Sequence, residues 1–443
     1  MRPIAVDLFA GAGGMTLGFE QAGFDVLAAV ELNPIHCAIH EFNFPFWSSL
    51  CASVENISGK KIRRLSKIKN KEIAVVFGGS PCQGFSMMGK RALDDPRNSL
   101  VFHFLRLILE LQPKYFVFEN VPGLTVGEHQ NFLLEIIGEF EKNGYQVEAN
   151  YQVLNAANYG VPQDRARLFI LGCRQGLKLP KYPQPLTAPK IFKKSKYIIV
   201  EPDLPATPTV WEAIGDLPEV ENYLKLIDRD WAIAEYGKPS DYSSKLRGIS
   251  PIENDYSYER LFDAYFLTCS TRTKHSAQSI ARFEQTQPGK TEPVSRFHKL
   301  AANGISKTLR AGTPRNRGAF TSPRPIHPKT PRCITVREAA RLHSYPDWFR
   351  FHLTKWHGFR QIGNSVPPLL AKAIATQIIH ALEIVPAKPV VTRELGDSNL
   401  LQLNMSQAAE KFGVAQNIIE PRKRNRDKKG VEGGEGEEGE EGE

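Results

Sequence analysis

Short apolar runs alternate with longer amphipathic stretches over the first 175 residues. The apolar runs are rich in β-branched and aromatic residues, and they predict strands at 4–8, 26–30, 73–77, 115–118, 146–153 and 168–171. The stretches between them have helical spacing and predict helices at 14–22, 34–42, 99–111 and 132–143. This alternation predicts an α/β fold with a doubly wound parallel sheet and helices on both faces. No helical pattern separates the last two strands, so we expect them to form an antiparallel edge.

The alternation breaks down between residues 176 and 330. Seven prolines fall between positions 180 and 208, and glycines recur further on, which indicates loops. Basic residues also gather here, because residues 290–332 contain ten Lys or Arg and a single acid, Glu292. We therefore predict a separate, smaller domain at 176–330 with a basic face.

Two further segments follow. Helical patterns at 336–343 and 367–384 predict that residues 331–385 dock back onto the domain formed by residues 1–175. From 386 to 443 we expect a mostly disordered charged tail with one short helix, because its low-complexity end cannot form a core.

The composition is that of a globular protein. Of the 443 residues 41% are hydrophobic, enough for a core, and no run approaches the roughly 18 uninterrupted apolar residues of a membrane helix. The N-terminus enters a strand at once and leaves no room for a signal peptide, so we expect a cytoplasmic protein without a membrane partner. The six cysteines form no Cys-x-x-Cys pair, and we predict neither disulfides nor a metal site.

The charge of the chain points to a polyanionic partner. The net charge is +9, but residues 430–443 carry seven of the 48 acids and no base. The remaining 429 residues therefore hold 57 Lys and Arg against 41 Asp and Glu, a net charge of +16. Such an excess favours nucleic acid as the partner, with general solubility as the alternative explanation.

Candidate chemistry begins at the end of the first strand. The glycine-rich turn at 7–14 lets the backbone approach a ligand closely, and the helix after it presents its positive end. Glu31 ends the second strand, where a carboxylate can accept hydrogen bonds from ribose hydroxyls. This pattern suits folds that bind NAD, FAD or S-adenosylmethionine. Its spacing differs from Gly-x-Gly-x-x-Gly, which argues against a dinucleotide.

A cysteine and an acid follow two later strands. Gly78 and Gly79 end one apolar strand and lead through Pro81 to Cys82, and Glu119 ends the next strand. Because adjacent parallel strands deliver such residues into one crevice, we predict that a thiol nucleophile and an acid face the same substrate. That pairing suits covalent attack on an electron-poor ring while the acid protonates or hydrogen-bonds a ring nitrogen. A buried structural cysteine is the alternative for a lone thiol.

Two later motifs add polar side chains. Gln163, Arg165 and Arg167 alternate along a predicted strand, so we expect all three on one face, where a guanidinium can donate to a carbonyl or a phosphate. The loop at 361–368 contains Asn364 and runs into a helix, which by itself indicates ordinary helix initiation.

Taken together, these segments resemble the ordered motifs of the C5-cytosine DNA methyltransferases of bacterial restriction-modification systems. The matches follow the order of the family and cover both ends of residues 3–385. They comprise 7–14, Glu31, 79–86, Asp95, Arg97, Leu100, 119–121, 163–167, 331–346 and 361–367.

The resemblance implies the Rossmann-like fold of S-adenosylmethionine-dependent methyltransferases, with the C-terminal helix completing the cofactor-binding domain and residues 176–330 recognising the target. It implies that Cys82 attacks C6 of cytosine and that Glu119 engages N3 and the exocyclic amine. Arg165 would bind the O2 carbonyl, and Arg167 belongs to the same catalytic set. The activated C5 would then take the methyl group from S-adenosylmethionine and lose its proton.

The resemblance also implies ligand contacts. It implies that the substrate is double-stranded DNA. Because a thiol cannot reach a cytosine inside a duplex, the base must be flipped into the pocket. We expect a monomer in the bacterial cytoplasm and nucleoid, with any cognate restriction endonuclease not bound to it. The positions that match cofactor contacts are Phe9, Gly11, Gly14, Leu17, Glu31, Asn56, Ile57, Pro81, Leu100, Asn364 and Val366. The residues expected to contact DNA are Ser86, Lys90, Arg91, Gln163, Arg272 and Arg310.

Three alternatives stay open. A tRNA cytosine-5 methyltransferase would use the same catalytic plan, but such relatives typically carry Cys-Phe-Thr in the variable domain, where this chain has only Leu-Thr-Cys269-Ser-Thr. A non-catalytic DNA-binding regulator would keep the fold, but the intact Cys82, Glu119 and Arg165 argue against decay. A dinucleotide oxidoreductase would account for only the first 60 residues.

Overall fold

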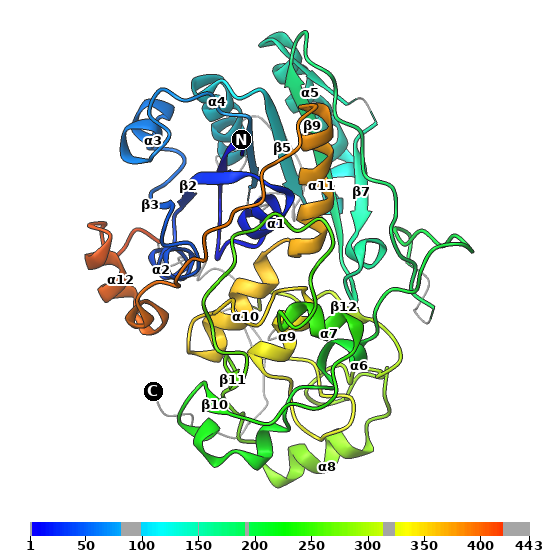
Figure 1. Cartoon of the computed structure of the whole chain (residues 1–443). Coiled ribbons are helices and arrows are strands. Elements are labelled where there is room, and N and C mark those ends of the chain that lie inside the picture. Colours follow the sequence, from blue (N-terminus) through cyan, green and yellow to red (C-terminus); the bar gives the residue numbers. More distant parts are fainter. Residues whose placement is uncertain (1, 81–98, 149, 191–194, 313–323, 420–443) are drawn as a thin grey trace, which may run out of the picture.

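A central sheet of eight strands organises the molecule, and a computed structural model describes it for residues 2–80, 99–148, 150–190, 195–312 and 324–419 (Figure 1). The strand order is β3-β2-β1-β4-β5-β9-β6, and β7 also pairs with β9. Strands β1 to β5 pair in parallel, whereas β9 runs antiparallel to β5, β6 and β7. The predicted α/β sheet and its antiparallel edge are therefore confirmed. The bounds are β1 Ile4–Leu8, β2 Asp25–Glu31, β3 Ser48–Cys51, β4 Val75–Gly79, β5 Tyr115–Asn120, β6 Tyr145–Val147, β7 Gln152–Asn155 and β9 Ala166–Arg174.

Helices cover both faces of the sheet, as the side chains of β5 show. On one face the Tyr115 hydroxyl donates to the carbonyl of Ala381 in α11 at 3.0 Å. On the other face Phe116 stacks on Phe140 of α5, with ring centroids 4.1 Å apart. No helix among the described residues is both long enough and apolar enough to cross a membrane. The helices of this domain are α1 Gly14–Ala22, α2 Pro34–Asn43, α3 Gly59–Leu65, α4 Ser99–Leu111, α5 Glu128–Lys142 and α11 Pro368–Ala381.

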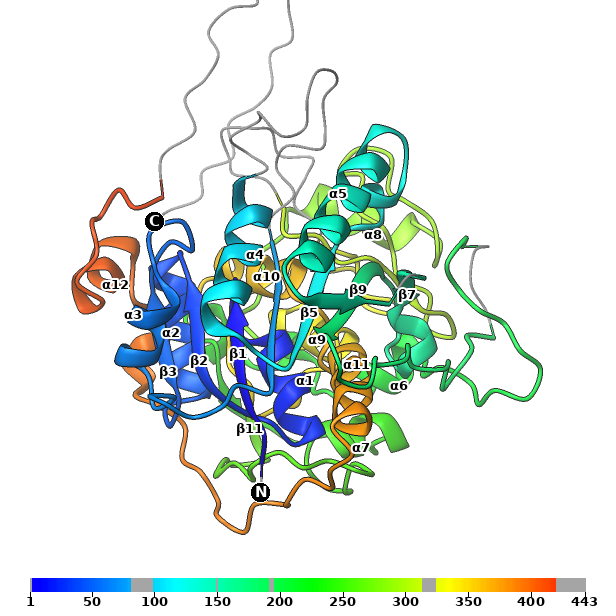
Figure 2. The same cartoon turned by 90° about the horizontal axis from the view of Figure 1, so that it is seen from above.

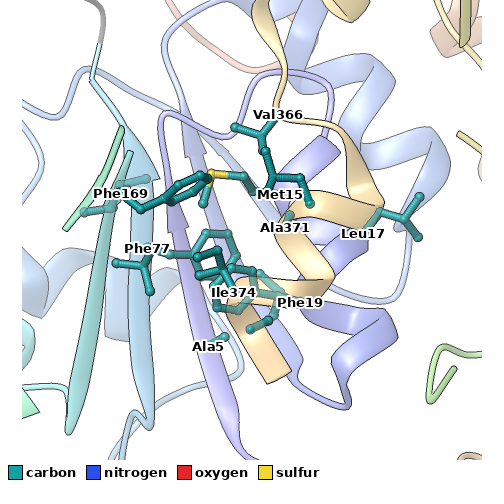
Figure 3. Packing of buried hydrophobic residues seen from close by; sticks show 14 of the residues in the cluster. Ala5, Met15, Leu17, Phe19, Phe77, Phe169, Val366, Ala371 and Ile374 are labelled. Carbon is teal, nitrogen blue, oxygen red and sulfur yellow. The ribbon is translucent and has the colours of Figure 1, made fainter. Parts of the chain in front are cut away.

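Helix α11 packs closely on α1 (Figure 3). A Cβ atom on Gly18 would lie 2.4 Å from that of Ala371, and one on Gly14 would lie 2.6 Å from the carbonyl oxygen of Val366. Both helices pack on the sheet, where Phe19 of α1 stacks on Phe77 of β4. Glycines on α1 thus let a later segment of the chain pack against the first one.

One predicted strand differs from the structure, and two elements were not predicted. The single strand expected at 146–153 is two strands, because Tyr145–Val147 pairs with the end of β9 and Gln152–Asn155 pairs with its beginning. Strand β3 and helix α3 were not predicted, and β3 is only four residues long.

The part between residues 176 and 330 contains short elements, shown below the sheet in Figure 1. Two small apolar clusters support it, one around Leu226 and Leu267 and one around Phe283 and Ile326. The domain boundaries themselves stay a prediction. Strand β8, Gln163–Asp164, precedes this part and pairs with β12. The elements in and after this part are α6 Val210–Ile214, β10 Ala232–Ile233, α7 Asp241–Leu246, β11 Phe266–Leu267, α8 Ala277–Gln285, β12 Ser306–Lys307, α9 Val336–Leu342 and α10 Lys355–Asn364.

Buried charges attach this part to α9. The Arg341 guanidinium donates to Asp216 at 3.0 Å and to Asp347 at 2.6 Å, and all three side chains are buried. Arg332 bridges Glu219 and Glu338 in the same way. Since each buried charge has an opposite partner, these networks fix how the returning segment lies on the loop-rich part.

The chain after residue 386 departs from the expected disordered tail. A 3-10 turn at Ser398–Gln402 (η8) and the helix α12 at Met405–Lys411 both contact α2. Both views place α12 beside α2, at the β3 side of the sheet (Figure 1 and Figure 2). Four buried apolar side chains hold this segment on the domain: Leu400, Leu401, Ala408 and Ala409. They form two adjacent pairs, and two pairs are too few to predict a packed face from the sequence. Residues 420–443 lie outside the described residues.

Candidate active site

A cavity of about 430 Å³ lies at the carboxyl ends of the parallel strands. It sits where the strand order reverses, with β2 on one side of β1 and β4 on the other, which is where open α/β sheets bind ligands. Its wall includes the turn after β1, the ends of β2, β4 and β5, and the α10–α11 connection. The lining comprises Asp7, 9–12, Gly14, Met15, 30–33, His36, 52–54, Gly79, Ser80, Leu100, 119–121, Arg167, Arg360, Gln361, 363–366 and Ile419.

Glu31 braces the glycine-rich turn. Its Oε2 accepts a hydrogen bond from the Gly11 backbone at 2.9 Å, and its Oε1 accepts one from the Asn33 backbone at 2.8 Å. Burial raises the pKa of the Glu31 carboxyl, and these backbone donors oppose that shift. Phe9 in the same turn has a φ of +64°, a strained conformation for a residue with a side chain. Each carboxylate oxygen can still accept a second donor, as a ribose hydroxyl would require.

Asp7 lies below this turn in a buried polar chain. The Thr16 hydroxyl donates to Asp7 Oδ2 at 2.6 Å and lies 3.1 Å from Nε2 of His40, whose Nδ1 lies 2.7 Å from the Ser49 hydroxyl. Burial raises the pKa of Asp7 to about 8 and lowers that of His40 to about 3, so both groups are neutral in the pH range between these values. This series of hydrogen bonds links β1, α1, α2 and β3 beneath the cavity.

Glu119 stands at the other end of the cavity. Its carboxylate lies 2.9 Å from Nε of Arg167 and is almost fully buried. Burial raises the pKa of Glu119, and the positive charges of Arg167 and Arg165 oppose the shift. A Cβ atom on Gly79 would lie only 2.2 Å from Oε2 of Glu119, so any side chain at position 79 would displace this carboxyl group. The ends of β4 and β5 therefore meet at the cavity, as predicted.

The two neighbouring arginines are separated by the structure. Arg165 is fully buried and lies outside the cavity lining, and it donates to the carbonyls of Leu309, Gly363 and Ser365 at 2.7–2.8 Å. Arg167 lines the cavity beside Glu119. The three side chains do not share one site, because Gln163 and Arg165 are both buried on Leu309 whereas Arg167 lines the cavity. The placement argues against a carbonyl-binding role for Arg165 and favours Arg167.

Gln163 was expected to contact DNA, but it is also fully buried. Its Nε2 donates to the carbonyl of Leu342, and its Oε1 accepts from the Leu309 backbone at 3.1 Å. Gln163 and Arg165 thus join β8 to residue 309 and to the elements around α9, α10 and α11. Arg310 is exposed, whereas the Arg272 guanidinium is paired with Glu221.

Seven of the predicted cofactor positions line the cavity, and three do not. Leu17 is fully buried, and Figure 3 shows it extending away from Met15, which does line the cavity. Asn56 and Ile57 lie beyond the wall, because β3 ends at Cys51 and residues 52–54 form the lining instead. The seven that line it are Phe9, Gly11, Gly14, Glu31, Leu100, Asn364 and Val366.

Several predicted residues lie outside the described ranges: Pro81, Cys82, Ser86, Lys90 and Arg91. Ser80, two residues before Cys82, lines the cavity beside Glu119.

Sequence reasoning missed other lining residues. Leu32 and Asn33 directly follow the predicted strand end at Glu31 and could have been inferred from it. Arg360 directly precedes the motif at 361–367 and could have been inferred in the same way, whereas Ile419 had no comparable signal, because only tertiary packing brings it to the cavity.

Comparisons with known proteins find related sequences and a related fold. A model of the family described as C-5 cytosine-specific DNA methylase matches residues 4–380. The chain is 56% identical over 427 residues to the Type II methyltransferase M.XorII of Xanthomonas oryzae pv. oryzae, covering 96% of each protein. It is 32% identical to the Type II methyltransferase M.AgeI of Thalassovita gelatinovora, covering 85% of this chain and 99% of the relative. Among solved structures, a putative DNA modification methyltransferase encoded within an E. coli prophage has a TM-score of 0.67 and 32% identity, covering 86% of this chain and all of that one.

Proposed function

We propose that this chain, which belongs to the C-5 cytosine-specific DNA methylase family, methylates a flipped cytosine through a covalent bond to Cys82. The family match and the named type II methyltransferases establish DNA cytosine-5-methyltransferase activity of the restriction-modification type. The proposal adds the roles of individual residues and the methyl donor, S-adenosylmethionine. The observation that carries it is the buried Glu119–Arg167 pair at one end of a cavity whose middle presents Glu31.

The residues present fit S-adenosylmethionine. Glu31 is held in place by two backbone donors and can accept from a ribose hydroxyl, and the turn at Gly11 leaves room for a close ligand. When bound, this cofactor supplies an electrophilic methyl group. Glu31 and the turn would hold its nucleoside part, and the Glu119 end would receive the target base.

Glu119 would activate the cytosine ring. Because burial raises its pKa, the carboxyl group can hold a proton and donate it to N3, while Arg167 donates to the O2 carbonyl. Both contacts draw electrons from the ring, so that the Cys82 thiolate can form a bond to C6. C5 then gains the methyl group and loses its proton, and the bond from C6 to sulfur breaks.

The substrate would be a short specific sequence in duplex DNA. A base in a duplex must be flipped out to reach such a buried pair. The exposed basic residues at 290–332, among them Lys290, Arg296 and Arg310, would neutralise phosphates, an interaction independent of sequence. A monomeric state, a bacterial cytoplasmic location and the independence of any endonuclease stay predictions.

Expression in a host that lacks cytosine methylation tests the proposal. We expect 5-methylcytosine at one short motif with the wild-type chain and none with Cys82→Ser. Unmethylated DNA from a folded chain that binds S-adenosylmethionine would contradict the proposal and favour an RNA substrate or a regulatory role.

A further inference from the structure

The end of the cavity remote from Glu119 carries two exposed apolar side chains. Leu32 follows Glu31 at the end of β2 and is 37% exposed, and Ile419, from the far end of the described chain, is 39% exposed. Both line the cavity, together with Val54 after β3. Apolar side chains that face a cavity lose contact with water only when a ligand covers them.

Ile419 reaches this place because the C-terminal segment is anchored on α2. The Lys411 ammonium of α12 lies 3.0 Å from Oε1 of Glu41, and Ala408 and Ala409 are fully buried against this part of the core. The Gly396 backbone donates to the carbonyl of Phe42 at 2.8 Å. The segment is therefore part of the folded domain, on the side of the sheet where β2 and β3 end.

The chain after α12 then turns back. The Val414 backbone donates to the carbonyl of Ala409, and that of Ile418 donates to the carbonyl of Ala415, both at 3.0 Å. These bonds close two successive turns, and the next residue, Ile419, lines the cavity. The position of Ile419 thus depends on the docking of α12.

Chemistry assigns a ligand part to each end of the cavity. The methyl group must meet the target base near Glu119, and Glu31 is placed for the ribose. The nucleoside base of the cofactor therefore lies beyond Glu31, toward Leu32 and Val54. A purine has flat, weakly hydrated faces, which apolar side chains cover well.

We propose that Ile419 contacts the adenine of S-adenosylmethionine beside Leu32, so that the C-terminal segment forms part of the cofactor site. This inference rests on the proposed function. No charged side chain occupies positions 52–54, so the wall here offers apolar contact and short polar groups. Affinity for the nucleoside then depends on a segment that follows the family match at 4–380.

Two substitutions and two truncations test the inference in the otherwise full chain. We would measure the Kd of S-adenosylhomocysteine calorimetrically for Ile419→Ala, Ile419→Asp and a matched control, Ile418→Ala, whose side chain is outside the cavity lining. We expect about a fivefold to twentyfold loss of affinity for Ile419→Ala, given the apolar area available, and a larger loss for Ile419→Asp. The control should stay within twofold, and the KM for DNA should not change.

The truncations separate the segment from the charged tail. A chain that stops after Ile419 should bind S-adenosylhomocysteine as the wild type does, whereas one that stops after Gly413 should lose as much affinity as Ile419→Asp. Equal affinity of the two truncated chains, or wild-type affinity of both Ile419 variants, would overturn the inference. A wild-type chain that binds no S-adenosylhomocysteine would instead overturn the proposed function.

Discussion

The two ends of the cavity are built from different kinds of side chain. At the β4–β5 end, Glu119 and Arg167 form a buried ion pair over Gly79, on strands that fix their positions. At the β2–β3 end, Leu32 and Ile419 are apolar and exposed, and the second of them comes from a docked C-terminal segment. The difference indicates that the two ends of the cavity have different roles. Substitutions at the first end should change the rate of methyl transfer, and those at the second should change cofactor affinity.

The largest effect is expected for Glu119→Gln. The amide keeps the shape of the side chain but cannot transfer a proton to N3, a transfer that the raised pKa of Glu119 favours. Single-turnover methylation should slow by about 10²–10⁴-fold, with little change in the Kd of S-adenosylhomocysteine. A rate within threefold of the wild type, or a parallel loss of cofactor affinity, would break the distinction between the two ends.

A second comparison concerns the two arginines. Arg165→Met should lower the free energy of unfolding by about 3 kcal/mol or more, because three buried carbonyls lose their donors. Arg167→Met should cost less stability but slow methylation at least tenfold, because Arg167 faces the cavity beside Glu119. Urea unfolding and single-turnover rates measured on both variants would show the two effects separately. If Arg165→Met proved stable and inactive, the role implied by the family resemblance would be restored.

Much of the reacting end was predictable because it depends on strand ends. Runs of apolar residues located β4 and β5, and parallel neighbours bring Gly79 and Glu119 together whatever the rest of the chain does. The role expected for Arg165 stays a prediction, because its guanidinium is buried on the carbonyls of Leu309, Gly363 and Ser365, which a strand pattern does not reveal.

The nucleoside end was less accessible to sequence analysis. Asn56 and Ile57 lie outside the cavity lining, and a short, half-buried β3 gives little signal about where it ends. Ile419 could not be found at all, since its position depends on how α12 packs on α2, and a segment with four scattered buried residues carries no periodic pattern. Local pattern therefore predicts what a single strand determines, and misses what distant packing determines.

The buried hydrogen-bonded side chains from Asp7 to Ser49, beneath the cavity, can be tested by varying the pH. The pKa of Asp7 is raised to about 8, above the value of about 3.9 for an unfolded aspartate, so the native state holds a proton that the unfolded state has lost between these values. Stability should therefore fall as pH rises through this window, by at most about 1.4 kcal/mol per unit from this group. Asp7→Asn should remove that part of the slope in urea unfolding between pH 5 and 8. An unchanged slope would show that Asp7 ionises normally and that the cavity floor is wetter than its burial indicates.

Leu32→Ala should have the smallest effect, and it tests whether the β2–β3 end of the cavity serves binding alone. Leu32 borders the cavity but supports no strand pairing, so its truncation should leave the unfolding free energy nearly unchanged. It should weaken S-adenosylhomocysteine binding about fivefold, since part of a leucine side chain would lose contact with the base. Combined with Ile419→Ala, the loss should be close to the product of the two single losses if each side chain covers its own part of the ring. A much smaller combined loss would mean that the two side chains cover the same part of the ring, and an unchanged kcat in all three variants would confine this end of the cavity to binding.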